Sequence, residues 1–510
     1  MGTIQITNRW LLRAAVWPIL LSLLAPAAAR AEWLRAESAS FIVYSSGSEE
    51  KLRERIAKLE EFDRLLRALT ATRSEPSPNK LVVYLVRNGA GMRQIAPLAS
   101  SVAGFYTATP DAILAVVNEA ENRGINEDDV LFHEYAHHFM LQYYPAAYPL
   151  WFSEGFAEYV MTARIEPDRI EYGNYNLARA SWLADRSVWL PYEDILFGDL
   201  SRMDGARFYA QSWLLVHYLL TDRRRQAALA DYMQAVGRGT DPRQAFAAAF
   251  GIEPRALRGE LSAYARRITY HRLARSVAPT APDIRVEALP ASADSLLLSS
   301  VALQLDVRER DRRPLLNRIR RLAARRADPF ARRVQARAEL LYGDPDVAER
   351  LLDAALAEAP GDAELLYLQG LRHLVAGRRD PAVRADRFRR AQAWFACAYR
   401  ANPDHVPTLF GSAESLSPSP QFLTENTRNM LLLAVQLAPQ VSQLRVSAAH
   451  FLLLREQYEL AEIMLLPLTA SAHRSGAAPR VQELLNLART RQRPRDSAVF
   501  RPLSETGEDR

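Results

Sequence analysis

The sequence predicts an α+β domain followed by an all-α array of helices. Three short apolar runs, residues 40–45, 80–86 and 112–117, have the length of strands, and helical periodicity dominates the chain after them. A stretch of small residues and prolines, 276–295, divides the chain. At 510 residues the chain also exceeds what one hydrophobic core usually supports. We therefore expect two domains, residues 32–275 and 296–490, joined by a linker over 276–295.

Residues 1–31 have the pattern of an export signal. Arg9 and Arg13 precede an apolar run over residues 14–25, acidic residues are missing, and Ala-Arg-Ala at 29–31 matches a cleavage site. An uncleaved membrane anchor is the alternative, but the apolar run is short for a bilayer span. We expect an exported bacterial protein, periplasmic or secreted, whose mature chain begins near Glu32.

The charge pattern predicts no nucleic-acid partner. The net charge of +6 comes almost entirely from arginine, since Lys51, Lys58 and Lys80 are the lysines of the chain. Arginines clustered over residues 308–326 could contact anionic lipid headgroups, but a solvated helix face explains them better. Any membrane contact should therefore be peripheral at most. The single cysteine, Cys397, excludes an internal disulfide.

Several helices are expected after the first strand. Apolar residues at helical spacing predict a helix over 49–70, and a second helix over 126–144 has an acidic first turn and ends before Pro145. The remaining helices of the first domain are expected over residues 150–162, 205–220, 223–237, 242–250 and 254–271.

Residues 133–137, on the helix expected over 126–144, read His-Glu-Tyr-Ala-His. His133 and His137 are four residues apart, so their imidazoles project from one helix face and can bind a single Zn2+ ion. The carboxylate of Glu134 can take a proton from a metal-bound water and return it to a leaving amine. Val130 and Phe139 fit the longer pattern around this motif, which argues against an accidental match.

A third ligand should come from another helix. Residues 151–159, Trp-Phe-Ser-Glu-Gly-Phe-Ala-Glu-Tyr, supply Glu154 and, one turn later, Glu158. This part of the chain resembles the gluzincins, zinc peptidases with two histidines and a downstream glutamate. It is similar in particular to the W-L-N-E-G-F-A segment of zinc aminopeptidases and to peptidase-MA-like domains. The resemblance implies a zincin-like fold over residues 32–275 and one Zn2+ held by His133, His137 and Glu154, with Glu158 as the alternative ligand or a supporting residue.

The chain also departs from the aminopeptidases, because no G-x-M-E-N segment is present to hold a free amine. The strand expected over 112–117 could instead bind an extended peptide at a sheet edge, which would suit an endopeptidase. Tyr209 and His217 follow in family order as candidate donors to the oxyanion, although either could simply pack. His138 lies off the metal face and should support rather than ligate.

The second domain should be a tetratricopeptide-like helical solenoid. Prolines at positions 329, 360, 403 and 439 end helical runs at spacings that scatter about the ~34-residue tetratricopeptide period. Such hairpins stack on their neighbours and leave a concave surface that commonly binds a protein partner. A simple bundle packed on the first domain is the alternative. The polar residues 491–510 are expected to be a disordered tail.

These patterns predict a zinc metallopeptidase that cleaves a polypeptide substrate, with the helical repeats recruiting the substrate or a partner. The first alternative is a non-enzymatic envelope scaffold built on a peptidase-like fold. Retention of Glu134 argues against it, because zinc binding would survive the loss of this residue and catalysis would not. A zinc hydrolase of peptidoglycan crosslinks or other amides would use the same residues and stays open.

Overall fold

The computed structural model describes residues 33–98, 102–120, 127–275, 281–326, 328–469 and 478–503. The predicted export signal lies outside these residues and stays a prediction. Among the described helices, none is both long and apolar enough to cross a membrane. Every candidate site residue named above lies within the described part.

A six-stranded mixed sheet forms the centre of the first domain, in the order β4-β5-β3-β2-β1-β9. The three predicted strands are confirmed as β2 (Phe41–Ser45), β3 (Leu81–Val86) and β5 (Ile113–Asn118), which run parallel to one another. β1 (Leu34–Glu37), β4 (Gly104–Ala108) and β9 (Arg285–Ala288) pair antiparallel with their neighbours.

The expectation of an edge strand at residues 112–117 is wrong. β5 lies between β3 and β4, and all of its residues are buried, as suits a strand that is apolar on both faces. The edge strand is β4, which pairs with β5 on one side. Its sequence, Gly-Phe-Tyr-Thr-Ala, is a weaker strand signal than that of β5.

The expectation of a linker over 276–295 is wrong for its described residues. β9 pairs with β1 and completes the sheet, and α11 (Ala293–Ala302) begins in the same stretch. α11 and α2 (Gly89–Ile95) share a hydrophobic cluster with side chains of one face of the sheet. α11, which lies largely within the range expected for the second domain, therefore packs against the first domain's sheet as well as against α12 and α13.

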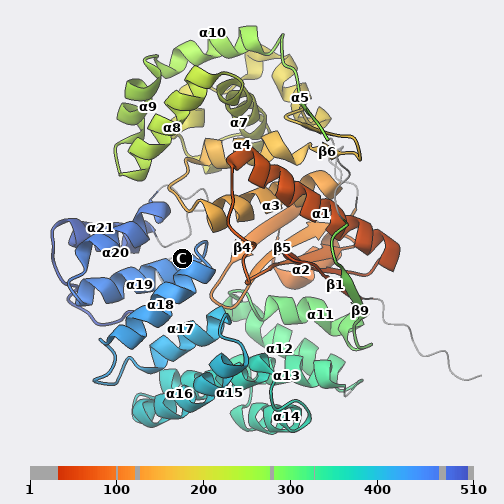
Figure 1. Cartoon of the computed structure of the whole chain (residues 1–510). Coiled ribbons are helices and arrows are strands. Elements are labelled where there is room, and N and C mark those ends of the chain that lie inside the picture. Colours follow the sequence, from red (N-terminus) through yellow and green to blue (C-terminus); the bar gives the residue numbers. More distant parts are fainter. Residues whose placement is uncertain are drawn as a thin grey trace, which may run out of the picture.

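The other face of the sheet carries α1 (Glu49–Thr70) and α3 (Glu127–Tyr143) (Figure 1). α1 has the predicted bounds because Ser48 caps its first turn by accepting a hydrogen bond from Lys51 N. α3 agrees with its prediction to one residue at either end. Phe62 of α1 stacks on Phe132 of α3, and Tyr135 packs edge-on against Phe41 of β2.

Further helices extend the domain beyond α3. The predicted helices are present as α4 (Leu150–Met161), α7 (Gly205–Leu220), α8 (Arg223–Gly237), α9 (Pro242–Phe250) and α10 (Pro254–Tyr264), with α5 (Leu177–Ala184) and α6 (Tyr192–Phe197) between them. α10 ends earlier than expected. β8 (His271–Ala274) follows it and joins β6 (Arg164–Ile165) and β7 (Arg169–Tyr172) in a small sheet. Ile268 and Thr269, which are β-branched and favour a helix less, lie between α10 and β8.

The helices α11–α21 form the helical array, in which each helix packs on the next in sequence. After α11 the array consists of α12 (Glu309–Ala323), α13 (Pro329–Tyr342), α14 (Pro345–Glu358), α15 (Ala363–Arg379), α16 (Arg384–Ala401), α17 (Val406–Ser415), α18 (Glu425–Leu437), α19 (Ser442–Leu454), α20 (Tyr458–Leu465) and α21 (Ala478–Arg489). The predicted array of helices is thus confirmed. Pro360, Pro403 and Pro439 follow helix ends, whereas Pro329 is the first residue of α13, where a missing N–H costs nothing.

The array curves along the first domain rather than standing apart from it (Figure 1). Asp111, in the turn between β4 and β5, accepts a hydrogen bond from Tyr367 of α15 at 2.8 Å and pairs with Arg337 of α13 at 3.4 Å. Gln440, just before α19, donates to Gln142 of α3 at 3.0 Å. The two predicted domains therefore share an interface of apolar and polar contacts.

The expected disordered tail, residues 491–510, is corrected for residues 491–503. Residues 496–503 pack against α19, and Val499 is only 2% exposed within the main hydrophobic cluster. The polar composition concealed this contact because its hydrogen bonds are made by backbone atoms. Residues 504–510 lie outside the described part.

Candidate metal centre

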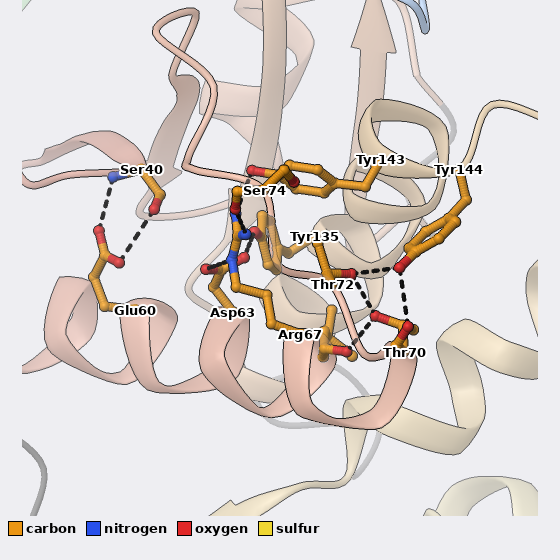
Figure 2. A network of polar contacts seen from close by, with 11 residues as sticks. Ser40, Glu60, Asp63, Arg67, Thr70, Thr72, Ser74, Tyr135, Tyr143 and Tyr144 are labelled. Atoms are coloured by element: carbon orange, nitrogen blue, oxygen red, sulfur yellow. Dashed lines mark hydrogen bonds and ion pairs between the residues drawn. The ribbon is translucent and has the colours of Figure 1, made fainter.

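α3 is fixed through the face that turns away from the candidate metal ligands. Tyr135 on this face donates a hydrogen bond to Asp63 of α1, and Asp63 also accepts from Arg67 (Figure 2). The Arg67 guanidinium lies 4.5 Å from the ring centroid of Tyr143. At the end of α3, Tyr144 bonds the carbonyl of Thr70 at 3.0 Å. These contacts bind α3 to α1 along its length, and they give Tyr143 and Tyr144 a packing role.

The opposite face of α3 presents His133 and His137, and Glu154 approaches from α4. The Nε2 atoms of the two histidines are 3.2 Å apart. Glu154 Oε2 lies 3.3 Å from His133 Nε2 and 3.4 Å from His137 Nε2. The structure therefore brings together the three residues that the sequence predicts as ligands, and among the described residues these form the cluster suited to a metal ion.

These distances fit the donor set of a Zn2+ ion. Bonds of about 2.0–2.1 Å at the tetrahedral angle would place ligand atoms roughly 3.3–3.4 Å apart. The three observed separations, 3.2, 3.3 and 3.4 Å, are close to that value. Two imidazoles and one carboxylate are also the donors that zinc peptidases use, and they leave one tetrahedral position for water.

Residues behind the histidines orient both rings. Ser153 Oγ is hydrogen-bonded to His137 Nδ1 at 3.2 Å. Glu158 Oε1 lies 3.7 Å from His133 Nδ1, and Arg179 of α5 holds the same carboxylate with a 3.0 Å bond. Because each Nδ1 faces a partner, each Nε2 is directed toward Glu154. Glu158 thus has the supporting position, and Glu154 the ligand position.

Gly155 lets α4 approach α7 closely enough to place these glutamates. A Cβ atom on Gly155 would lie 2.5 Å from Ser212 O and 2.7 Å from Val216 Cγ2, so no larger residue fits. The result is a buried pair of carboxylates: Glu154 is 3% exposed and Glu158 is 2% exposed.

The pKa values of the site shift in opposite directions. Burial alone would lower the pKa of His133, but the Glu154 carboxylate outweighs it and raises this pKa to about 9. Burial alone would raise the pKa of Glu154, but both imidazoles hold it well below its usual range. The carboxylate thus attracts a proton onto His133 when no metal is bound. A cation at this position would displace that proton.

Glu134 lies between α3 and the edge strand β4. The backbone N–H of Tyr106 in β4 bonds its carboxylate, while burial raises the pKa of Glu134. β4 can lie this close because it has a glycine at position 104, where a Cβ would stand 2.7 Å from Val130 Cγ1 and 3.4 Å from Glu134 Oε1. The predicted base therefore lies beside both the triad and the edge strand β4.

The structure separates the two predicted oxyanion donors. The Tyr209 ring centroid lies 6.3 Å from that of His133, and the carboxylates of Glu154 and Glu158, together with burial, hold the pKa of Tyr209 above its usual value. Tyr209 is thus a protonated donor beside the triad. His217, two turns further along α7, is wholly buried and bonds Tyr264 at 2.7 Å.

The expectation that His217 serves the site is therefore wrong. Its ring packs among Tyr159, Trp213 and His271, and burial lowers its pKa to about 4. His138 also has a structural place: its Nδ1 is 3.3 Å from the Tyr106 hydroxyl, and burial lowers its pKa to about 3. The hydrogen-bond partners of these two imidazoles are Tyr264 for His217 and Tyr106 for His138.

Sequence reasoning missed three residues of this site: Ser153, Arg179 and Tyr106. Ser153 stands directly before the predicted ligand, so its position next to Glu154 was a usable signal. Arg179 and Tyr106 come from a short helix and a weak strand with no motif around them. Only the packing of α5 against α7 and of β4 against α3 reveals their roles.

No family model matches the chain, and no curated protein matches it. Among solved structures, a thermophilic TPR protein of Thermus thermophilus is similar over 39% of this chain and 100% of its own, at 17% identity and a TM-score of 0.33. A TM-score this low carries no argument. The description of the helical array therefore rests on the helices and packing given above.

Proposed function

We propose that the chain is a zinc-dependent peptidase of the gluzincin type that hydrolyses peptide bonds in extended polypeptides. One observation carries the proposal: donor atoms of His133, His137 and Glu154 stand 3.2–3.4 Å apart, beside the partly buried carboxylate of Glu134. We further propose that the protein is exported from a bacterial cell and that the helical array, of the tetratricopeptide type, recruits polypeptides.

The ligand residues would hold one Zn2+, which when bound lowers the pKa of a water and polarises the scissile carbonyl. Glu134 accepts the proton of the attacking water on a carboxylate oxygen and later donates it to the leaving nitrogen. Burial raises the pKa of Glu134, which favours this return of the proton. The N–H of Tyr106 holds the carboxylate in place between these two transfers.

Two further features suit peptide hydrolysis. Tyr209 stays protonated, so its hydroxyl can donate a hydrogen bond to the carbonyl oxygen of the scissile peptide bond as that oxygen gains negative charge. β4 pairs with β5 on one side only within the described sheet, so an extended peptide can add to its other edge. Such pairing would align a peptide bond with Glu134, which bonds Tyr106 of the same strand.

The test compares zinc content and casein cleavage for the chain from Glu32, for Glu134→Gln and for Glu166→Gln. Glu166 is an exposed glutamate outside the site, so it controls for the same chemical change. We expect equal zinc in all three proteins and cleavage by all except Glu134→Gln. Zinc without cleavage by any of them would favour the non-enzymatic scaffold. Absence of zinc at neutral pH would refute the metal site.

A further inference from the structure

Residues 496–503 lie against α19 without forming a helix or a strand. Three polar side chains on one face of α19 meet them, at positions 443, 447 and 450. Such a spacing places the side chains in line along a helix. We call the surface formed by Gln443, Ser447 and His450, together with Phe410 and Phe422, the C-terminal groove.

The polar side chains of the C-terminal groove form hydrogen bonds with backbone atoms of residues 496–503. Gln443 donates to the carbonyl of Arg501 at 3.1 Å and accepts from the N–H of Leu503 at 3.0 Å. Ser447 donates to the carbonyl of Val499 at 2.9 Å, and His450 Nε2 lies 3.1 Å from the carbonyl of Asp496. Any polypeptide has these carbonyl and N–H groups, so another chain could make the same bonds.

Side-chain preferences add to the backbone contacts. Val499 is 2% exposed, and the ring of Phe500 lies 5.3 Å from that of Phe410 and 6.0 Å from that of Phe422. The Asp496 carboxylate is 3.4 Å from His450 and 3.5 Å from Arg480. The groove thus selects an acidic residue followed, three and four positions later, by an aliphatic and an aromatic residue.

The segment does not fill the space available to it. A cavity of about 140 Å³ remains between residues 498–503 and helices α19 and α21. A larger cavity, about 840 Å³, begins at Phe500 and Leu503 and continues past Tyr367 and Phe410 to residues 108–111, where β4 ends. A bound polypeptide longer than residues 496–503 would therefore find further surface.

We propose that the C-terminal groove is a binding site for a non-helical polypeptide segment of a partner protein, and that residues 496–503 occupy it as an internal ligand. The partner carries the acidic, aliphatic and aromatic pattern of Asp496, Val499 and Phe500. This inference goes beyond the proposed hydrolysis and does not depend on a metal. A tethered segment competes at an effective concentration on the order of millimolar, so a partner must displace it.

The test measures binding of a fluorescein-labelled synthetic peptide of residues 494–503 by anisotropy, with EDTA present and in the Glu134→Gln background. Failure of the peptidase proposal would then leave the result unaffected. Val499→Asp with Phe500→Asp should release the internal segment, and this variant should bind the peptide at least about tenfold more tightly than the unreleased chain.

Two matched controls locate the binding. Adding Gln443→Ala and Ser447→Ala to the released variant removes the backbone contacts and should abolish binding. A peptide carrying Phe500→Ala should bind about tenfold more weakly, because a buried aromatic anchor contributes much of such an interface. Equal binding of a scrambled peptide, or no binding to the released variant at ~1 mM peptide, overturns the proposal.

Circular dichroism shows whether the doubly substituted chain folds, and Phe500→Ala alone serves as a milder released variant. Hydrogen exchange of the unsubstituted chain needs no variant. Excess peptide should speed exchange at the Leu503 amide, which Gln443 protects. Unchanged exchange at saturating peptide also contradicts the proposal.

Discussion

Glu158→Gln should weaken zinc binding although it leaves the three donor atoms in place. Glu158 Oε1 is 3.7 Å from His133 Nδ1, and Arg179 holds the same carboxylate. A carboxylate behind a ligating imidazole orients the ring and raises its basicity, and its loss typically costs roughly 10–100-fold in metal affinity. We expect the zinc dissociation constant to rise by this factor.

The size of the effect follows from the contact distance. Two unit charges at the 3.7 Å of this contact interact by at most ~4.5 kcal/mol at an effective dielectric constant of about 20. A ligating imidazole is neutral, so only part of this energy acts, in agreement with the ~1.4–2.8 kcal/mol that 10–100-fold represents. The substitution also leaves the Arg179 guanidinium without its carboxylate near the cation site. The upper half of the range is therefore expected.

The measurement is competition for zinc with a chromophoric chelator at neutral pH. Glu339→Gln is the matched control, because Glu339 is 1% exposed and accepts hydrogen bonds from Nε and Nη2 of Arg320 in the helical array. The control should lose thermal stability without a change in zinc affinity. If Glu158→Gln binds zinc within about twofold of the unsubstituted chain, Glu158 does not support His133 as argued.

Three other outcomes follow from the geometry. Gly155→Ala should lower the free energy of unfolding in urea by about 2 kcal/mol or more, because its Cβ would lie 2.5 Å from Ser212 O; unchanged stability would contradict the close approach of α4 and α7. Tyr209→Phe should lower kcat of peptide cleavage about 100–1000-fold at unchanged zinc affinity, whereas His217→Gln should lower stability alone; the reverse pattern would exchange their roles. Burial would raise the pKa of Glu364, but its histidine and arginine neighbours lower this pKa to about 2. The Glu364 carboxylate therefore contributes fully to folding stability above its usual pKa of 4.5, and this contribution is lost as the pH falls toward 2. Glu364→Gln should thus reduce the loss of stability that urea titrations measure between pH 4.5 and pH 2.

Local sequence patterns were sufficient to predict a helix or strand wherever the element's own residues indicate its type and its ends. α1 has a serine cap and apolar residues at helical spacing, so both of its ends could be predicted. The triad could be predicted because His133 and His137 share one face of a helix and Glu154 belongs to a recognisable segment on the next one. The structure adds the distances between them, which no spacing rule provides.

Contacts between distant parts of the chain could not be predicted in this way. β9 pairs with β1, although the sequence of almost the whole first domain separates the two strands. The proline-containing stretch around β9 has the composition of a linker, so its place in the sheet could not be predicted. Arg179 comes from a short helix whose own pattern gives no reason to expect a bond to Glu158. The tail over residues 491–510 is polar overall, yet side chains of α19 bind the carbonyls of Val499 and Arg501 within it. In each case the structure of the segment depends on the distant part of the chain that it contacts, rather than on its own sequence pattern.

β4 is one element, besides α3, through which the candidate metal centre and the helical array meet. Tyr106 in β4 bonds Glu134 through its backbone. Asp111, in the turn that follows β4, is held by Tyr367 and Arg337 of the array. The cavity at the end of the C-terminal groove reaches the same turn. β4 itself is held by its pairing with β5, and the array contacts it at the end that lies next to this turn. The array therefore contacts, at Asp111, the turn that ends the strand beside the candidate site.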